Sequence, residues 1–372
     1  MDFDVAVLGG GISGLGVARE LTERGKRVVV LEANGLGNAT SNNTLRIIHG
    51  GFRYLQQLDL LRMMKSLKDQ RDLLIEVPDA LKVLPCVMPL NRFGLKSALP
   101  VWCASTFYGA MLSLLDSSVS APRILSKSEA ARRVPFLAGR APYGALLWHD
   151  VVMQHPERII SFLAEQIQLR KGVLRENTKV KGLIQRTEGW EVTLDRQGCL
   201  TAHVVVSTLG PWVNQLTIEG SLTQGFPISW CKGINVSVAS PLDSEYAIGV
   251  ESRDGRLFFV VPREGGSTIG TWYVPVEPPA SPTHPATRTE SEETNAFLDA
   301  FNKAVGYEAY APHSVLSCDV GVLPMTRIGP RGPELVGNER YNRKERFVEV
   351  LSTKYTTFRS QGRKVAEIIT RL

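Results

Sequence analysis

The hydrophobic and polar positions near the N-terminus predict a strand, a helix and a second strand. Phe3–Leu8 is a short apolar run rich in strand-forming residues, and it leads directly into a glycine-rich stretch. From Ile12 onward the apolar residues recur at helical spacing until Gly25, which is a good C-terminal stop. The apolar run 27–31 predicts a second buried strand, and an acidic residue follows it.

This order of elements is typical of a unit that binds a dinucleotide, and each glycine has a physical role in it. Gly9 allows a tight turn, Gly11 lets a pyrophosphate approach the backbone, and Gly14 lets the helix pack closely on the strand. The phosphates would meet free N–H groups at the helix N-terminus, where the helix dipole also favours negative charge. The alternative is an ordinary α/β domain with a glycine-rich turn.

Further along the chain, the pattern predicts a mixture of helices and short strands. An amphipathic helix is expected over 58–74, and further helices are expected over 157–171, over 292–304 and at the C-terminus. The remaining apolar runs alternate like strands, several of them in an antiparallel sheet, over 178–184, 190–194, 202–207, 233–239, 246–250, 256–261, 267–271 and 347–351. The proline-rich segment 275–289 should form a loop, and Thr289 with Glu292 forms a capping-box pattern.

Composition and charge exclude several classes of protein. The chain has 372 residues and a net charge of +6, but its basic residues are scattered, so nucleic acid is not the expected partner. A basic surface would favour anionic substrates or anionic lipid headgroups. The five dispersed cysteines indicate reduced thiols in a reducing, cytoplasmic compartment, and no cysteine–histidine spacing indicates a metal site. Because the first strand begins almost at once, no signal peptide is expected.

The uncharged segment 97–115 is long enough to be considered as a membrane span. It contains Pro100, Gly109 and several hydroxyl side chains, and it is not strongly apolar. We therefore expect a buried or surface-lying helix here, and contact with the surface of a membrane stays open.

Several further motifs follow the N-terminal unit in a fixed order. They are the segment 40–55, which contains His-Gly-Gly-Phe-Arg-Tyr, then STLGPW at 207–212, Lys232-Gly233, STIGT at 267–271 and STKYTTFR at 352–359. Together with the glycine motif, they resemble the FAD-dependent glycerol-3-phosphate dehydrogenases of the D-amino-acid-oxidase-like (DAO) flavoprotein superfamily. The resemblance covers nearly the whole chain.

The resemblance implies FAD as the cofactor and an α/β fold with two domains. A discontinuous, Rossmann-like FAD-binding domain would comprise 1–80, 150–220 and 320–372. An inserted α+β substrate-binding domain with a mainly antiparallel sheet would comprise 81–149 and 221–319. The family's additional C-terminal domain is not expected in this chain.

The resemblance also implies which residues hold FAD. The glycine motif, with Ile12 and Ser13, would hold the ADP part, and Glu32 would accept hydrogen bonds from ribose hydroxyls. Thr356 and Thr357 would face the flavin ring, although plain helix capping is their alternative role. The other candidates for the cofactor site are Thr40, Ser41 and Arg46 along the pyrophosphate and ribityl chain, Val180 by the adenine, and Ile48, Gly210 and Trp212.

The resemblance is broken where the family holds its substrate. The family has a GxRP motif whose arginine binds a phosphate or carboxylate, whereas this chain has Leu323 at that position. Leucine cannot make the charge-assisted pair that arginine makes with an oxyanion. Asn235 stands where the family has a histidine, and asparagine cannot act as a base near neutral pH. The FAD-binding motifs are thus present, while the substrate contacts differ.

Five residues remain as candidates for catalysis or substrate binding besides Asn235. Arg53 and Tyr54 would meet the substrate, and Arg327 could replace the lost arginine unless it is a solvated loop residue. Arg53, Lys354 and His49 are the catalytic candidates. His49 beside two glycines could instead be structural, and Lys354 could be an exposed lysine.

These residues predict an FAD-dependent dehydrogenase or oxidase that transfers a hydride from a CH–OH carbon of a small polar substrate to flavin N5. Oxygen or a quinone would be the electron acceptor. One alternative is an amine or amino-acid oxidase with a CH–NH donor. Another is a flavin-binding partner subunit without turnover.

Overall fold

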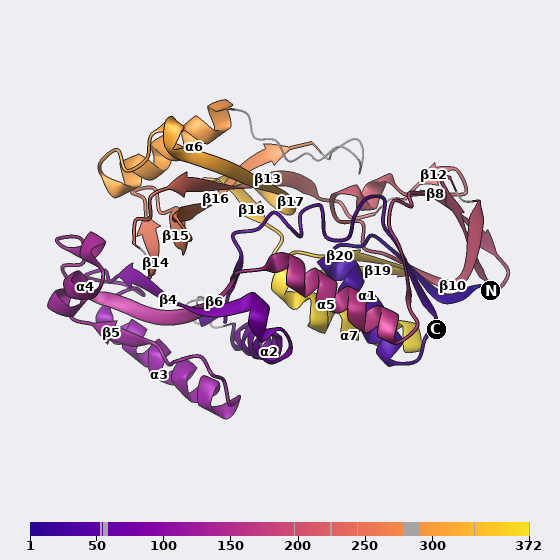
Figure 1. Ribbon diagram of the computed structural model, residues 1–372, viewed down its shortest axis with the longest axis horizontal. Coiled ribbons are helices and arrows are strands. Elements are labelled where there is room, and N and C mark those ends of the chain that lie inside the picture. Colours follow the sequence, from indigo (N-terminus) through magenta and orange to yellow (C-terminus); the bar gives the residue numbers. More distant parts are fainter. Residues whose placement is uncertain are drawn as a thin grey trace.

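The computed structural model describes residues 1–52, 54, 59–196, 198–223, 225–243, 245–277, 291–330 and 332–371. Figure 1 shows an elongated molecule in which two sheets lie toward opposite ends of the long axis. This arrangement confirms the predicted α/β fold, with one sheet built on the N-terminal βαβ unit and a second, largely antiparallel sheet.

The first sheet has a parallel core. Strand β1 (Phe3–Leu8) lies between β2 (Val28–Leu31) and β10 (Cys199–Ser207), and all three run parallel. Every residue of β2 is buried, as expected for a strand that is covered on both faces. The other strands of this sheet are β7 (Val173–Arg175), β8 (Val180–Arg186), β9 (Gly189–Leu194), β11 (Thr217–Ile218), β12 (Ser221–Leu222), β19 (Arg340–Lys344) and β20 (Phe347–Leu351).

Helices α1 (Ile12–Glu23), α5 (Pro156–Leu169) and α7 (Phe358–Thr370) pack together beside this sheet (Figure 1). Two glycines allow α1 to start where it does. Gly9 has a φ of +98°, and a Cβ there would lie 2.7 Å from the carbonyl oxygen of Thr208. A Cβ at Gly14 would lie 1.9 Å from the carbonyl oxygen of Gly9, so only glycine permits this close approach of helix and strand.

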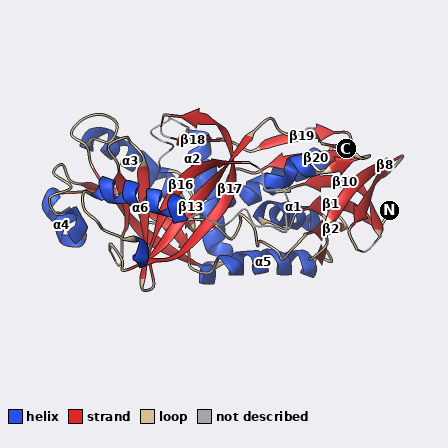
Figure 2. Ribbon diagram, turned by 90° about the horizontal axis from the view of Figure 1, so that it is seen from above, coloured by secondary structure: helices blue, strands red, loops and turns tan. Residues whose placement is uncertain are grey.

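The second sheet is antiparallel apart from the pair of β4 (Leu81–Pro89) and β14 (Ala247–Glu251). Its other strands are β3 (Ile47–Ile48), β5 (Arg123–Leu125), β6 (Ala145–Met153), β13 (Ser229–Ala239), β15 (Leu257–Arg263), β16 (Gly266–Val276), β17 (Val315–Gly329) and β18 (Gly332–Leu335). Helix α6 (Ser291–Val305) crosses one face of this sheet (Figure 2). Phe297 of α6 stacks on Phe258 of β15, and Phe301 meets the same ring edge-on, so these aromatic contacts hold the helix on the sheet.

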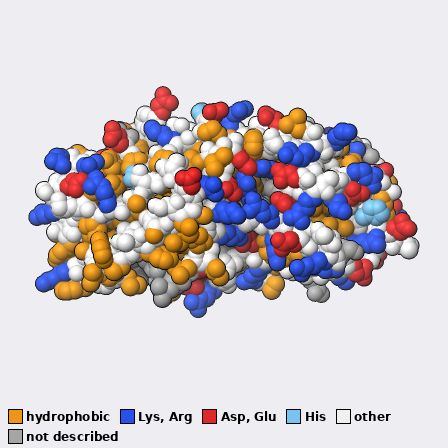
Figure 3. Space-filling model, turned by 90° about the horizontal axis from the view of Figure 1, so that it is seen from below, with side chains coloured by type: hydrophobic (Ala, Val, Ile, Leu, Met, Phe, Trp, Pro, Cys, Tyr) orange, Lys and Arg blue, Asp and Glu red, His pale blue; other side chains and the backbone are white. Residues whose placement is uncertain are grey.

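Three helices remain: α2 (Leu60–Glu76) packs against α7, whereas α3 (Ala98–Leu114) and α4 (Lys127–Arg133) pack against β5 of the second sheet. Helix α3 occupies the uncharged segment and lies at the surface, with Leu99, Trp102 and Leu114 exposed. Figure 3 shows hydrophobic side chains gathered toward this end of the face, and Lys and Arg gathered nearer its middle. None of the described helices combines the length and the hydrophobicity that a membrane span requires.

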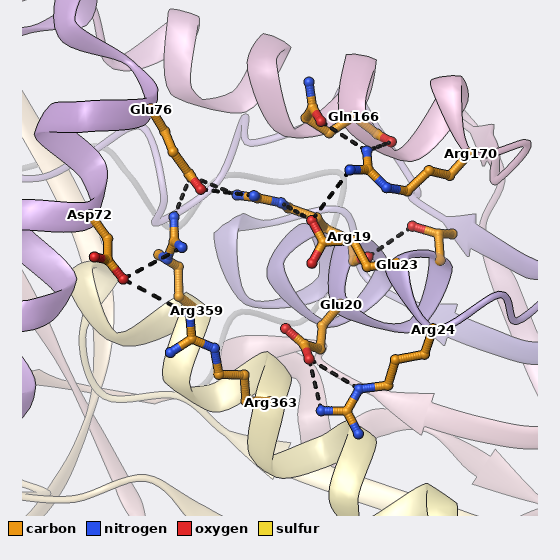
Figure 4. Close-up of polar contacts among 11 residues, drawn as sticks. Arg19, Glu20, Glu23, Arg24, Asp72, Glu76, Gln166, Arg170, Arg359 and Arg363 are labelled. Carbon is orange, nitrogen blue, oxygen red and sulfur yellow. Dashed lines mark hydrogen bonds and ion pairs between the residues drawn. The ribbon is translucent and has the colours of Figure 1, made fainter.

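A group of ion pairs joins α1, α2 and α7 (Figure 4). Arg19 donates two hydrogen bonds to Glu76, and Arg359 pairs with both Glu76 and Asp72. Burial alone would raise the pKa of Glu76, but the two arginines hold it below its usual value. The pairs therefore anchor both α1 and the start of α7 to the last turn of α2.

Most predicted elements are confirmed with small shifts at their ends, and the five cysteines are free. One prediction was wrong at its boundary, because Pro275 and Val276 belong to β16 rather than to a loop. They pair with Cys231 and Trp230 at the end of β13, and these pairs extend the ladder. Residues 278–290, and with them Thr289 of the capping-box pattern, lie outside the described residues.

The domain boundaries stay a proposal. The last FAD-binding segment was expected to start at residue 320. Because β17 and β18 belong to the second sheet, sheet membership favours a start after these strands. It also assigns β3 and the whole of β6 to that sheet, although 1–80 and 150–220 were expected in the FAD-binding domain. The reason is β-pairing: β6 pairs with both β3 and β4 along its length.

Candidate active site

A cavity of about 1530 Å³ is lined by residues of both sheets. It brings together most of the residues that the sequence singled out. They are Gly9, Gly11, Ile12, Ser13, Glu32, Thr40, Ser41, His49, Tyr54, Val180, Gly210, Trp212, Asn235, Lys354 and Thr356.

One end of the cavity is formed by the N-terminal unit. Gly11, the N-cap of α1, offers no side-chain cap, and the N–H of Ile12 donates to Ser41 Oγ at 3.0 Å. The Glu32 carboxylate accepts from the N–H of Gly10 at 2.6 Å and of Asn34 at 2.9 Å. Each carboxylate oxygen keeps acceptor capacity for a ribose hydroxyl. The turn thus offers N–H donors for phosphate and an acceptor for ribose.

Three buried polar atoms that border the cavity have no hydrogen-bond partner among the described residues: Trp212 Nε1, Thr353 Oγ1 and Tyr355 Oη. A buried polar group without a partner is costly, so these atoms fit a site that a polar ligand completes. Burial also raises the pKa of Tyr355, which keeps its hydroxyl protonated and able to donate. Together with the glycine turn, these groups fit FAD.

The start of α7 lies beside the same cavity. The turn Tyr355–Thr357 precedes the helix, and Ser13 Oγ of α1 donates to Gln361 of α7. Thr356 lines the cavity, whereas the hydroxyl of Thr357 donates to the carbonyl of Lys354 at 3.3 Å. The first turn of α7 is therefore held against the first turn of α1.

At the other end of the cavity, His49 pairs with Asp150. His49 Nδ1 lies 2.9 Å from Asp150 Oδ2, and Asp150 also accepts from the N–H of Gly50 at 2.8 Å and from Trp148 Nε1 at 3.1 Å. Burial alone would raise the pKa of Asp150, but His49 and the two other donors hold it below its usual value. A buried carboxylate that stays ionised can fix the tautomer of the imidazole.

Lys354 and Tyr54 form a second polar pair in the cavity. Lys354 Nζ donates to the Tyr54 hydroxyl and lies 4.4 Å from the centroid of the Tyr54 ring. Arg62 of α2 lies over the same ring, at 4.6 Å from its centroid. The Tyr54 hydroxyl and the Lys354 ammonium group therefore lie next to each other in the wall of the cavity.

Asn235 and Leu323 occupy the walls formed by β13 and β17. Asn235 is buried, and its Oδ1 accepts from the Thr271 hydroxyl at 2.9 Å. Leu323 pairs with Cys231 in the sheet and lines the cavity. The position that the family resemblance assigns to an arginine therefore presents an aliphatic side chain to the cavity.

Several predicted site residues do not line the cavity: Gly14, Arg46, Ile48, Thr357 and Arg327. The expectation that Arg327 replaces the lost arginine is not supported, because its guanidinium is exposed and bonds Glu334 at 2.7 Å. Arg46 instead lies 4.0 Å from Asp319. Arg53 lies outside the described residues.

Sequence reasoning missed Asp150. A signal was present, since Asp150 stands in the apolar strand sequence ALLWHDVVM. A carboxylate in such a strand must be paired, because an unpaired buried charge is expensive. Within the part of the chain that the structure describes, no cluster of His, Cys, Asp and Glu could hold a metal ion.

The sequence matches the DAO family, described as FAD dependent oxidoreductase, over residues 4–348. A glycerol-3-phosphate dehydrogenase from Mycobacterium leprae is 28% identical over 298 residues, which are 75% of this chain and 49% of the relative. An aerobic glycerol-3-phosphate dehydrogenase from Staphylococcus aureus is 22% identical over 390 residues, covering 100% of this chain and 67% of the relative. The chain thus spans about half the length of several curated relatives that it matches.

Solved structures share the fold. The glycerol-3-phosphate dehydrogenase from Bacillus halodurans complexed with FAD has a TM-score of 0.73 and 18% identity, covering 100% of this chain and 64% of that one. Glycine oxidase from Geobacillus kaustophilus has a TM-score of 0.69 and 19% identity, with 99% and 95% covered. The family match over most of the sequence, the shared fold and the glycine cradle together show that this chain belongs to the FAD-dependent oxidoreductase (DAO) family, whose cofactor is FAD.

Proposed function

We propose that this chain is an FAD-dependent dehydrogenase or oxidase that acts on a CH–OH carbon. The observation that carries the proposal is that the His49–Asp150 pair and the glycine cradle line one cavity. FAD, when bound, supplies the acceptor for the hydride that leaves the carbon. The residues of the chain must then bind the alcohol, orient it and accept its hydroxyl proton.

His49 is our candidate for the proton acceptor. Its Nδ1 is engaged by Asp150, which leaves Nε2 as the ring atom that can accept a proton from the substrate. Asp150 would hold the ring in this tautomer and stabilise the imidazolium that forms. Because the carboxylate is buried and hydrogen-bonded, it can do so without being protonated itself.

Lys354 and Tyr54 would bind the oxygen of the substrate. The ammonium group of Lys354 favours the negative charge that develops on the oxygen as its proton leaves. Arg53, which precedes Tyr54 in the sequence, is proposed to orient the polar group of the substrate. Asn235 would donate an amide N–H to the same region, since its Oδ1 is occupied by Thr271.

The cofactor contacts proposed from the sequence follow the two ends of the cavity. Gly11 and Ser13 would face the pyrophosphate, Glu32 the ribose and Val180 the adenine. Thr356, at the start of α7, would face the ring, where the helix N-terminus favours negative charge. The other proposed contacts are Ile12, Gly9, Thr40, Ser41, Gly210 and Trp212.

Anaerobic bleaching of the visible flavin band by candidate donors tests this function. The panel should contain hydroxy acids, phosphorylated polyols, neutral alcohols, amines and amino acids. Carbonyl formation without release of ammonia or a primary amine would support a CH–OH donor, whereas release of either would identify an amine or amino-acid oxidase. If no donor bleaches the flavin and photoreduced protein is not reoxidised by oxygen or a quinone analogue, a partner subunit without turnover is favoured.

Glycerol 3-phosphate is a weaker candidate than the names of the curated relatives suggest. Leu323 cannot make a charge-assisted pair with a phosphate, and Arg327 is engaged by Glu334 and does not line the cavity. Bleaching by micromolar glycerol 3-phosphate would contradict this interpretation of Leu323.

We also propose that α3 contacts the surface of an anionic membrane. Leu99, Trp102 and Leu114 are 70%, 58% and 72% exposed. In the loop before α3, Phe93 and Leu95 are exposed as well, and the exposed Arg92 lies over the Phe93 ring. An apolar patch beside basic residues fits the boundary between anionic headgroups and acyl chains.

A further inference from the structure

One wall of the cavity, formed by β13, β16 and β17, contains an apolar surface. Leu323 of β17, Thr271 and Tyr273 of β16 meet above Gly233 of β13. A Cβ at Gly233 would lie 3.2 Å from Leu323 Cδ1, 3.1 Å from Thr271 Cγ2 and 3.4 Å from Tyr273 Cε1. Glycine therefore leaves room for these larger side chains, one of which, Leu323, stands where the family resemblance implies a substrate-binding arginine.

The apolar surface continues onto β4, β6 and β15. Phe259 and Trp148 border the cavity with ring centroids 5.9 Å apart, and Phe259 also contacts the edge of the His49 ring, at 6.2 Å. Met88 and Leu257 line the same region, and both lie 3.5 Å from a Cβ placed at Gly249. The candidate base thus stands next to an aromatic and aliphatic surface.

The cations near this surface are committed elsewhere. Arg263 of β15 donates to the carbonyl of Leu45 at 3.0 Å and does not line the cavity, and burial lowers its pKa to about 10. Lys96 lines the rim and pairs with Glu251 at 2.8 Å. Two further cations among the described lining residues lie beside Tyr54. Lys354 donates to the Tyr54 hydroxyl, whereas Arg62 lies over the Tyr54 ring and donates to the carbonyl of Gly337.

We propose that the group next to the reacting carbon, on the side of Leu323, is an uncharged aromatic or branched aliphatic group. This inference rests on the proposed function and names the substrate class of the same site. A phosphate or carboxylate placed against Leu323, Tyr273 and Phe259 would lose its hydration without gaining a charged partner. An apolar group of similar size gains free energy as it leaves water. The substrate would therefore carry its hydroxyl at one end and an apolar group at the other.

A matched pair of ligands tests the inference. Glycerol 3-phosphate and 3-phenylpropane-1,2-diol share a propanediol core and differ in the terminal group. Titration calorimetry of the FAD-loaded protein, without turnover, gives the two dissociation constants. We expect the phenyl compound to bind at least about tenfold more tightly, since such pockets discriminate by roughly 10- to 200-fold. Equal or tighter binding of glycerol 3-phosphate, or no binding of the phenyl compound at millimolar concentration, would overturn the inference.

The variant Leu323→Arg should reverse the preference, because it places a guanidinium on the same wall. Leu323→Met is the control, since it keeps an apolar side chain of similar volume, and it should retain the preference for the phenyl compound within about threefold. If Leu323→Arg does not fold, the comparison of the two ligands on the unchanged protein still decides. A folded Leu323→Arg protein that keeps the original preference would contradict the role given to Leu323.

Flavin bleaching separates the two proposals. Tight binding of the phenyl compound without bleaching would contradict oxidation of a CH–OH carbon and would leave the apolar subsite standing. Bleaching by glycerol 3-phosphate alone would leave the proposed oxidation standing and would remove the subsite.

Discussion

His49 Nδ1 lies 2.9 Å from Asp150 Oδ2, although 101 positions separate the two residues in the sequence. The pairing of β3 with β6 is the reason. Ile47 pairs with Val152 and Ile48 with Val151 in an antiparallel register. The same register, continued by one residue, brings His49 opposite Asp150. Both side chains line the cavity that carries the FAD cradle.

The first prediction concerns this pair. Asp150→Asn should lower kcat by about 10² to 10⁴, because an amide cannot stabilise the imidazolium that forms when His49 accepts a proton. Stopped-flow reduction of the flavin measures the effect. Asp195→Asn, which removes a surface partner of Lys181, is the control. Unchanged flavin reduction in a folded, FAD-loaded Asp150→Asn protein would rule out the assigned role.

The second prediction concerns the cradle. Gly11→Val should yield folded protein without FAD, because the side chain would occupy the approach of the pyrophosphate. A Cβ at Gly11 meets only Ser41 Oγ, at 3.1 Å, among the described atoms, so it projects into otherwise open space. The ratio of flavin to protein absorbance measures occupancy. Thr22→Val, a buried change in the same helix away from the cavity, should stay yellow. A yellow Gly11→Val protein would contradict the assignment.

The third prediction concerns pH and stability. Asp69 of α2 is 2% exposed, and burial raises its pKa from 3.8 to about 6. Between about pH 4 and pH 6 the folded state therefore binds more protons than the unfolded state, and this residue makes stability fall as the pH rises. Above that window the ionised carboxylate costs up to roughly 3 kcal/mol of unfolding free energy. Asp69→Asn removes the charge and retains an acceptor for Ser360.

Asp69→Asn should thus be more stable than the unchanged protein at pH 7.5, by on the order of 1–3 kcal/mol, and nearly equal to it at pH 4. Urea unfolding at the two pH values measures the difference. Asp79→Asn, at an exposed carboxylate just after α2, should change neither value appreciably. If the stability difference between Asp69→Asn and the unchanged protein is the same at pH 4 and at pH 7.5, the folded protein tolerates the Asp69 charge and the prediction is wrong.

The fourth prediction concerns α3. The protein should sediment with vesicles that contain phosphatidylglycerol and less with vesicles of phosphatidylcholine alone, because the net charge is +6. The double change Leu99→Ser and Trp102→Ser should weaken binding at least about tenfold, since two apolar side chains no longer leave water. Leu169→Ser removes a leucine that is 75% exposed on α5, and it should have little effect. Equal sedimentation of the double variant would exclude α3 as the contact.

The sequence alone determined the local elements and the cofactor class. The strand Phe3–Leu8, the helix from Ile12 and the glycine turn between them are encoded by short-range hydrophobic spacing and by backbone sterics. These properties involve neighbours along the chain, so they can be recognised without a fold. The family motifs are also short and local, and they indicated FAD as the cofactor. The match to the FAD dependent oxidoreductase family over residues 4–348 agrees with this prediction.

Only the tertiary structure decided which side chains share the cavity. Sequence spacing could not show that Asp150 meets His49, that Arg327 is held by Glu334, or that Leu323 packs with Tyr273 above Gly233. Each of these relationships depends on the register of strands that are distant in sequence, and a shift by one residue would turn every side chain to the opposite face. The chemistry of the cofactor is therefore readable from local pattern, whereas the chemistry of the substrate depends on how the sheets pair.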